Sequence, residues 1–418
     1  MKGPIARGTI RTTLALGLRL LVQAGTLLLV ARMLGPHQFG AFTGVAALAV
    51  MLGTLSTFGT HLVLLGEVSK ESTRREQVLP YAVPFTLLCG SALLVIYLAV
   101  CEFALSEAGV PLAVLLAIGA AETLLQPLFG LPAAEHLARG HIARSQLLTT
   151  LPLALRLAAA AAVSLLSPAD PLTAYGYGYF AASLIALAIA SATMPAPWPA
   201  LKNWRLPNRT EVRNAAGYAA LNMTALSPTE FDKTLATKLL PLGASGLYAA
   251  GARVIGATTL PVSAMMLSAL PRLFREGQKD AQHTARLLHW IFAAALGYSV
   301  TLAAVLWFIA PVFVWLFGPK YHGIQHTIHW LTLAVPGMAM RLAAGNVLMA
   351  IGKPWMRVGF EVFGFLVLVV ATVMLAPRFD TAGMALALAC SEWAMTLLGW
   401  MLVHQALTPS KTRPLQSP

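Results

Sequence analysis

The chain has 418 residues, of which 57% are hydrophobic and 11% are charged. A soluble domain has about 25% charged residues, so this composition excludes a water-soluble protein with an ordinary polar surface. The net charge of +13 does not predict nucleic-acid binding, because in a membrane protein an excess of basic residues records the orientation of the loops.

Apolar runs of about twenty residues, the length that crosses a hydrocarbon core of about 30 Å as a helix, recur along the whole chain. Polar residues, prolines and glycines mark the breaks between them. The first run follows a short basic segment but is too long for a signal-peptide core, so we expect it to be retained. The first six predicted spans are 9–34, 39–65, 79–100, 110–133, 147–166 and 172–194.

The longest break, at 195–214, is basic and rich in proline and tryptophan. Six further spans follow, at 215–239, 245–270, 287–310, 327–351, 358–376 and 384–404. The predicted fold class is therefore an all-α integral membrane protein with twelve transmembrane helices, in two six-helix lobes around a central cavity. The corresponding domains are an N-terminal lobe at 1–194, an inter-lobe linker at 195–214, a C-terminal lobe at 215–404 and a tail at 405–418.

Basic residues alternate between the two sides of this topology. Loops on the side of the N-terminus carry 20 of the 29 lysines and arginines, and the opposite ends carry four. Cytoplasmic loops of membrane proteins are enriched in these residues. The pattern predicts a multi-pass protein with both termini, the linker and the tail in the cytoplasm. The outward loops are short, so we expect no external catalytic domain and no catalytic residue.

The hairpin after the first span contains features that recur after the seventh. A cation precedes a tight outward turn, which a glycine and an aromatic residue follow. The matching pairs are each 206 residues apart: Arg32 and Lys238, Gly40 and Gly246, Phe42 and Tyr248. This indicates an internal repeat whose halves are related by an axis along the membrane normal. The alternative interpretation is coincidence among turn-forming residues.

Several short segments at these places also carry a family resemblance. They are Ala31–Gly40 with Phe58-Gly59, Gly246–Val254 followed by Ala269–Arg272, Leu316–Gly318 with Tyr321, and Ala350–Pro354. In their order and spacing the chain resembles the polysaccharide exporter branch of the multidrug/oligosaccharidyl-lipid/polysaccharide flippase superfamily, which includes O-antigen flippases.

The resemblance implies a bacterial inner-membrane protein that moves an undecaprenyl-pyrophosphate-linked oligosaccharide from the cytoplasmic to the outer leaflet by alternating access. Its product would serve cell-surface polysaccharide biosynthesis, such as that of lipopolysaccharide O-antigen. The implied partners are membrane lipids and the lipid-linked oligosaccharide, with polysaccharide-assembly proteins as a further class and no nucleic acid. The implied protein is a transporter and not an enzyme.

Eight charged residues fall inside predicted spans. A charge near the bilayer centre costs about 2.5 kcal/mol or more, so each should face water or a partner. The arginines are Arg19, Arg156, Arg253 and Arg341, and the acids are Glu122, Asp232, Glu361 and Glu392.

The four arginines are the predicted substrate-binding residues, because a guanidinium presents a planar fork of donors that suits pyrophosphate oxygens. Arg156 and Arg341 lie nearest mid-span, one in each half, and we expect them to converge on the ligand. The alternative is that they pair with the buried acids or extend to the interface near helix ends.

The four acids are the predicted ion-coupling residues, Glu122 above all. Burial raises the pKa of a carboxyl group towards the range where a proton or sodium ion can switch it. The alternative is a fixed ion pair with an arginine. The span with Asp232 and Lys233 is the least hydrophobic, which predicts a broken or cavity-lining helix. We expect no cofactor beyond a coupled proton or sodium ion.

Two clusters of histidine and tyrosine lie near outward ends of spans. His322, His326 and His329 have a helical spacing that zinc could use, but no carboxylate accompanies them, so an interfacial polar face is favoured and no metal site is predicted. Tyr175, Tyr177 and Tyr179 are predicted to be interfacial anchors.

Two rival functions stay open. One is a cation-coupled exporter of small amphipathic compounds on the same fold. The other, a membrane-embedded glycosyltransferase or polymerase, would need an acidic residue on a large outward loop, which the sequence lacks. No Walker A motif is present, so direct coupling to ATP is not expected.

Overall fold

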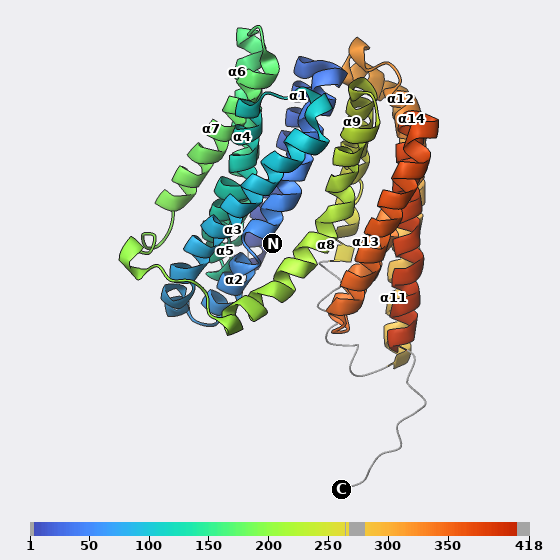
Figure 1. Ribbon diagram of the computed structural model, residues 1–418. Coiled ribbons are helices and arrows are strands. Elements are labelled where there is room, and N and C mark those ends of the chain that lie inside the picture. Colours follow the sequence, from blue (N-terminus) through green and yellow to red (C-terminus); the bar gives the residue numbers. More distant parts are fainter. Residues whose placement is uncertain (1–3, 264, 267–280, 408–418) are drawn as a thin grey trace. The chain divides into compact units, whose positions relative to one another are not determined.

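The computed structural model describes residues 4–263, 265–266 and 281–407, with side chains for 17–219, 230–263, 265–266 and 288–406. Thirteen α-helices are described over their full length, residues 260–263 and 265–266 are also helical, and the described residues contain no strand (Figure 1). The first seven are α1 Pro4–Ser56, α2 Thr60–Lys70, α3 Arg75–Ala104, α4 Leu112–Ala120, α5 Gln126–Ala138, α6 Ile142–Leu166 and α7 Pro171–Ala192. The others are α8 Arg209–Leu239, α9 Leu242–Ala257, α11 Ala281–Phe317, α12 Ile324–Leu331, α13 Ala334–Ala350 and α14 Pro354–Leu407.

Short helical turns connect several of these helices. A π-helical turn, η3, at Ala121–Leu125 joins α4 to α5. Four 3-10 turns are η1 Ser72–Arg74, η2 Ser106–Ala108, η4 Leu201–Asn203 and η5 Pro319–Tyr321.

Two of the helices contain a sharp break where the sequence predicts a turn between spans. In α1 the break is at Gly35, with φ 68° and ψ 169°, directly before Pro36. In α14 it is at Asp380, with φ 53° and ψ −131°. Positive φ is disfavoured for residues with a Cβ atom, and Asp tolerates it better than most. In α14 the two predicted spans 358–376 and 384–404 lie on either side of the break. In α1 the break separates the first span from the second, and the second continues past the end of α1 into α2.

Seven helical stretches of the described residues are long and apolar enough to cross a membrane, or eight if the bent pair α12 and α13 forms one span. The bend between α12 and α13 is 43°. The chain is therefore a multi-pass helical membrane protein, as predicted. The count of twelve spans in two lobes around a cavity stays a prediction.

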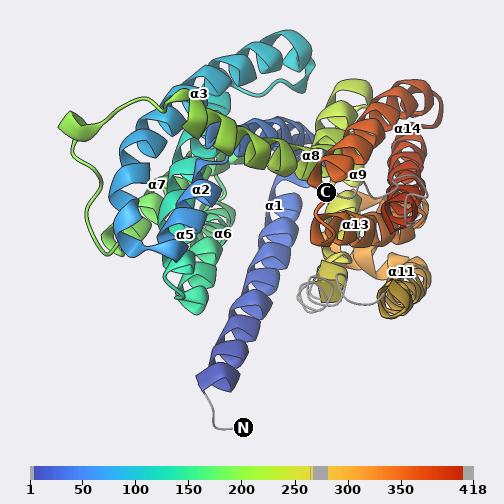
Figure 2. The same cartoon turned by 90° about the horizontal axis from the view of Figure 1, so that it is seen from below.

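The chain packs as two compact units. Unit 1 contains the residues up to Ala250 together with Phe313–Gly323, and unit 2 contains Gly251–Val312 and the residues from Ile324 onward. The lobe boundaries predicted from the sequence stay predictions, and 408–418 of the predicted tail lie outside the described residues. In unit 1, the start of α1 projects away from the neighbouring helices (Figure 2), and four of the five residues at 17–21 are exposed.

The segment between α7 and α8 is attached to unit 1. Arg75 of α3 donates hydrogen bonds to the carbonyl oxygens of Ala196 and Pro197, at 2.7 and 2.9 Å. Further along, the backbone N–H of Arg205 donates to the carbonyl oxygen of Pro80 at 3.0 Å. Trp204 packs against the apolar core formed by α2, α3 and α5. The predicted linker, residues 195–214, therefore lies across the N-terminal end of α3, and we call it the strap.

Candidate functional site

Glu122, the foremost predicted coupling acid, lies in the π-helical turn η3. A π-helical turn contains one residue more than a turn of α-helix, and such turns are frequent at functional sites. Gly53 of α1 packs against the backbone of Glu122, so closely that a Cβ atom on Gly53 would overlap the Glu122 carbonyl oxygen. This contact fixes the acid at a helix crossing inside unit 1.

The carboxylate of Glu122 pairs with Arg156 of α6. The Nη2 atom of Arg156 donates to Glu122 Oε1 at 2.8 Å and to the Ser183 hydroxyl at 3.1 Å. The hydroxyl of Tyr179 donates to the same carboxylate oxygen. The guanidinium also lies over the Tyr179 ring, 3.7 Å from its centroid. These four residues form what we call the Glu122 cluster.

The Glu122 cluster is enclosed. Glu122 is 5% exposed and Arg156 9%. Phe42 of α1 packs edge-on against Tyr175 and Tyr179, with ring centroids 5.3 and 6.0 Å apart. Both of these tyrosines are buried, so the prediction that they are interfacial anchors was wrong, whereas Tyr177 is 53% exposed. The two tyrosines on the buried face of α7 supply a hydroxyl and an aromatic wall that the sequence pattern did not predict.

Arg341 of α13 occupies a similar position in unit 2. Its Nε donates to Glu392 Oε2 at 2.7 Å, and its Nη1 lies 3.8 Å from Glu361 Oε1. Arg357 donates to the same oxygen of Glu361 at 3.0 Å. Two guanidinium groups and two carboxylates therefore alternate in a buried network that is electrically balanced.

Asp232 of α8 forms a third buried polar group, in unit 1. Tyr248 of α9 donates to its Oδ2 at 2.7 Å. The Lys233 ammonium lies 3.4 Å from both Asp232 and Glu230. Lys233 is 4% exposed and was not among the predicted site residues, although the low hydrophobicity of this span could have indicated it. An uncompensated lysine would be costly there, so the neighbouring acids stabilise it.

The four predicted arginines have different surroundings. Arg156 belongs to unit 1, and Arg253 and Arg341 belong to unit 2. Arg156 and Arg341 pair with the predicted coupling acids, which was the alternative interpretation of these charges. Arg253 of α9 is exposed and Arg19 of α1 is half-buried, and neither has an ion-pair partner among the side chains that the structure describes.

Two of the three clustered histidines have aromatic partners. The ring of His329 stacks on Trp307 at 4.2 Å, and Trp330 donates to His326 Nε2 at 3.1 Å. In the described part of the chain, no group of three potential ligands could hold a metal ion.

The comparison with protein families gives one match. A family described as polysaccharide biosynthesis protein matches residues 5–276, about two thirds of the chain. The chain belongs to this family. No curated protein is detectably similar to it in sequence.

Solved structures of the MOP superfamily share the fold of this chain. An inward-facing multidrug resistance MATE family transporter matches with a TM-score of 0.75 and 11% identity, over 95% of this chain and 98% of that chain. The lipid II flippase MurJ, in an inward closed conformation, matches with a TM-score of 0.74 and 12% identity, over 94% of this chain and 87% of that chain. A MOP superfamily transporter from Pyrococcus furiosus matches with a TM-score of 0.66 and 12% identity, over 97% of this chain and 95% of that chain.

A fourth charge cluster lies at the C-terminal end of α5. Glu135, fully buried, pairs with Arg75 at 2.9 Å and with Arg139 at 2.9 Å. Arg75 also holds the linker, so this acid connects α5 to the strap. Glu135 was not among the predicted site residues, although its spacing from Arg139 is that of a helical ion pair.

Proposed function

We propose that this protein is a flippase for an undecaprenyl-pyrophosphate-linked oligosaccharide, which it moves from the cytoplasmic to the outer leaflet of the bacterial inner membrane by alternating access. Membership in the polysaccharide biosynthesis family and the fold shared with a lipid II flippase support this proposal. So does the asymmetry of basic residues, which favours both termini in the cytoplasm. Polysaccharide-assembly proteins are proposed partners.

The observation that carries the proposal is the exposed guanidinium of Arg253. It lies within the predicted span 245–270, and no ion-pair partner occurs among the described side chains. A charge there is costly in hydrocarbon, so its side chain needs water or an anion. A pyrophosphate moving across the membrane supplies such an anion, and Arg19 is the second arginine in this situation. We therefore assign the substrate contact first to Arg253 and Arg19.

For Arg156 and Arg341 we propose a conditional role. Each is neutralised by a carboxylate, so it becomes available to an anion only when that acid takes up a proton or sodium ion. Ion coupling at Glu122, and at Glu361 and Glu392, would then switch an arginine between two partners. Asp232, hydrogen-bonded by Tyr248, is the fourth acid proposed for coupling.

The test replaces Arg253 by alanine and by lysine, with Arg378→Ala, an exposed arginine in a predicted outer loop, as matched control. A charge-assisted contact contributes about 1.5–3 kcal/mol, so alanine should weaken binding of undecaprenyl pyrophosphate by about ten- to a hundredfold. Lysine should restore only part of the affinity, because the planar fork is lost. Surface glycan should fall accordingly in cells. Wild-type affinity and surface glycan in the alanine variant would overturn the assignment.

A cation-coupled exporter of small amphipathic compounds is the second candidate, because a MATE transporter and MurJ match the fold almost equally. Uptake of a cationic dye into proteoliposomes, abolished by Glu122→Gln, would favour it. Absence of dye transport in a sample that binds undecaprenyl pyrophosphate would favour the flippase. The family and the similar structures are those of transporters, which gives no support to the glycosyltransferase or polymerase.

A further inference from the structure

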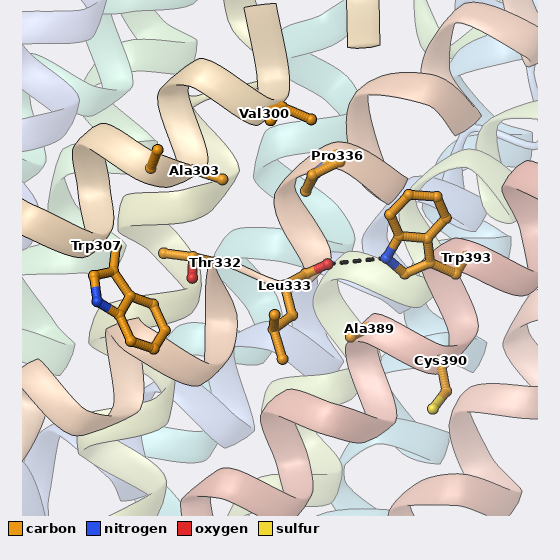
Figure 3. Close-up of a pocket in the computed structure, with 10 residues that line it drawn as sticks. Val300, Ala303, Trp307, Thr332, Leu333, Pro336, Ala389, Cys390 and Trp393 are labelled. Atoms are coloured by element: carbon orange, nitrogen blue, oxygen red, sulfur yellow. Dashed lines mark hydrogen bonds between the residues drawn. The ribbon is translucent and has the colours of Figure 1, made fainter. Parts of the chain in front are cut away.

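Unit 2 contains a groove of about 570 Å³ between α11, the bend from α12 to α13, and α14 (Figure 3). The bend separates the two helices at Thr332 and Leu333. Small residues form the neighbouring surfaces, namely Ala303 and Ala304 on α11 and Ala389 on α14. Bent helices and short side chains leave the space that a straight, leucine-rich packing would fill.

Two tryptophans form opposite walls of the groove, and both are held in place (Figure 3). The Trp307 ring stacks on His329, with centroids 4.2 Å apart and planes 18° apart. The Nε1 atom of Trp393 donates to the Leu333 carbonyl oxygen at 3.0 Å. This bond holds the Trp393 ring against the bend between α12 and α13. The walls are therefore pre-organised.

Two of the polar groups at the groove have partners within the protein. Thr332 donates its hydroxyl hydrogen to the His329 carbonyl oxygen at 2.6 Å, and Trp393 is bound to Leu333. A ligand in the groove would meet mostly carbon atoms, together with the Cys390 thiol and the indole of Trp307. Such a lining favours the binding of an apolar chain. It disfavours a peptide, because the backbone N–H and C=O groups of the peptide would find no hydrogen-bond partners there.

A second copy of the protein does not fit the size of the groove. A helix is about 10 Å wide and rises about 5.4 Å per turn, so the groove would accept roughly one turn. A stable interface buries about 800 Å² on each partner, which needs several turns. The volume lies instead in the range of about 300–1,000 Å³ that is common for small-molecule sites.

We propose that this groove holds a segment of the polyprenyl chain of the lipid-linked substrate. The inference rests on the proposed function. In the predicted topology α12 follows an outer loop, so the groove faces the outer half of the bilayer. While the sugar crosses between leaflets, the chain must stay in hydrocarbon. A rigid slot for the chain keeps the headgroup near the protein and raises its effective concentration at the transport path.

Cys390 provides a reporter for the test, because it is exposed and lines the groove. The other two cysteines, Cys89 and Cys101, are replaced by alanine. The protein is reconstituted in vesicles, and the rate of N-ethylmaleimide labelling of Cys390 is measured with added undecaprenol or with equal dioleoyl phosphatidylglycerol. Val373→Cys, on an exposed face of α14 outside the groove, is the matched control in a background with Cys390→Ala.

Undecaprenol should slow the labelling of Cys390 by about tenfold when roughly nine tenths of the sites are filled, and should leave the control thiol unchanged. Ala303→Phe, which fills the groove, should abolish the protection by blocking the chain. Equal protection by the phospholipid, absence of protection, or a crosslink between two copies through Cys390 would each overturn the proposal. Undecaprenol has no pyrophosphate, so its protection should persist in Arg253→Ala. If Arg253 does not bind the pyrophosphate, the protection of Cys390 by undecaprenol is unaffected. If the groove does not bind the polyprenyl chain, that protection is absent whatever residue 253 is. The two assignments are therefore tested separately.

Discussion

Gly40 of α1 lies directly against Gly246 of α9, so closely that a Cβ atom on Gly40 would be 2.8 Å from the Gly246 amide nitrogen. The same atom would overlap the carbonyl oxygen of Leu242. In return, a Cβ atom on Gly246 would lie 2.7 Å from the carbonyl carbon of Pro36. Residues 36 and 40 correspond to 242 and 246 at the 206-residue spacing of the predicted repeat. The contact is reciprocal, as a twofold relationship requires.

The two cations of the repeat show the same reciprocity. Arg32 donates to the carbonyl oxygens of Leu316 and Trp315 at the end of α11, at 2.8 and 3.1 Å. Lys238 lies 3.7 Å from Glu107, in the turn after α3. Adding the repeat spacing of 206 to Glu107, the partner of Lys238, gives position 313, which lies near the end of α11. Trp315 and Leu316, the partners of Arg32, lie in that same region. The two cations therefore have partners at corresponding positions of the repeat. We call the glycine contact and these two cation contacts the outer clasp, and they support the internal repeat.

The first prediction concerns the outer clasp. Gly40→Ala and Gly246→Ala should each lower the thermal stability of the purified protein, because the added methyl group forces the two backbones apart. Overpacking of this kind costs about 1–3 kcal/mol. Gly243→Ala, where no atom lies within 4 Å of the added Cβ, is the control and should be neutral. Unchanged melting temperatures for both clasp variants would contradict the tight contact.

The second prediction concerns the Glu122 cluster. Arg156→Ala leaves a buried carboxylate without its cation, and breaking a buried pair in this way costs about 3–5 kcal/mol. Most of the lost stability should return in the double variant Arg156→Ala, Glu122→Gln, as measured by thermal unfolding in detergent. If the double variant is as unstable as Arg156→Ala alone, the ion pair is not what the arginine contributes.

The third prediction separates coupling from structure at the same residue. Glu122→Gln keeps the hydrogen-bonding shape but cannot take up a proton or bind sodium as a carboxylate does. Transport should then become independent of the pH or sodium gradient while the protein stays folded in the membrane. Glu135→Gln, a buried acid outside the proposed coupling set, is the control. Persistent gradient dependence in the Glu122 variant would leave Glu122 a structural partner of Arg156.

The fourth prediction concerns the pH dependence of the linker. Arg205 binds Glu211 through two hydrogen bonds of 2.8 and 2.7 Å, which hold the pKa of the Glu211 carboxyl below its usual value of 4.5. A lowered pKa means that the stabilisation is complete above pH 4.5 and is lost as the pH falls through the folded-state value. Because Arg205 is partly exposed, the effect should be at most about 1 kcal/mol.

Hydrogen exchange of residues 195–208 measures this attachment. Exchange should accelerate as the pH is lowered below 4.5, after correction for the intrinsic rate. Glu211→Gln should show faster exchange at neutral pH and no further transition. Glu71→Gln, which removes an acid from the surface turn near α2, should behave as wild type. An acid transition that survives in the Glu211 variant would show that another group holds the linker.

The fifth prediction is the topology. Reporter fusions should place in the cytoplasm the positions after Arg75, Arg144, Arg209, Lys279 and Lys353. They should place outside the positions after Glu107, Asp170 and Lys320. Two or more reversed sites would contradict the arrangement of twelve spans that the basic residues predict.

The sequence by itself determined that the protein is helical and lies in a membrane. Hydropathy is a property of consecutive residues, so a run of apolar side chains predicts a membrane-crossing helix without knowledge of its neighbours. The same reasoning marked Glu122, Arg156, Arg341 and Glu392 as charges that need a partner or water.

Only the tertiary structure decided which charge has which partner. Glu122 and Arg156 are 34 residues apart, and Arg341 and Glu392 are 51 apart, so no local pattern relates them. Their pairing depends on which helices pack together and on the rotation of each helix about its axis. The π-turn at Glu122 and the burial of Tyr179 are likewise features of the tertiary structure. A sequence shows that a membrane-buried charge must be compensated, but the compensating group is selected by contacts between helices.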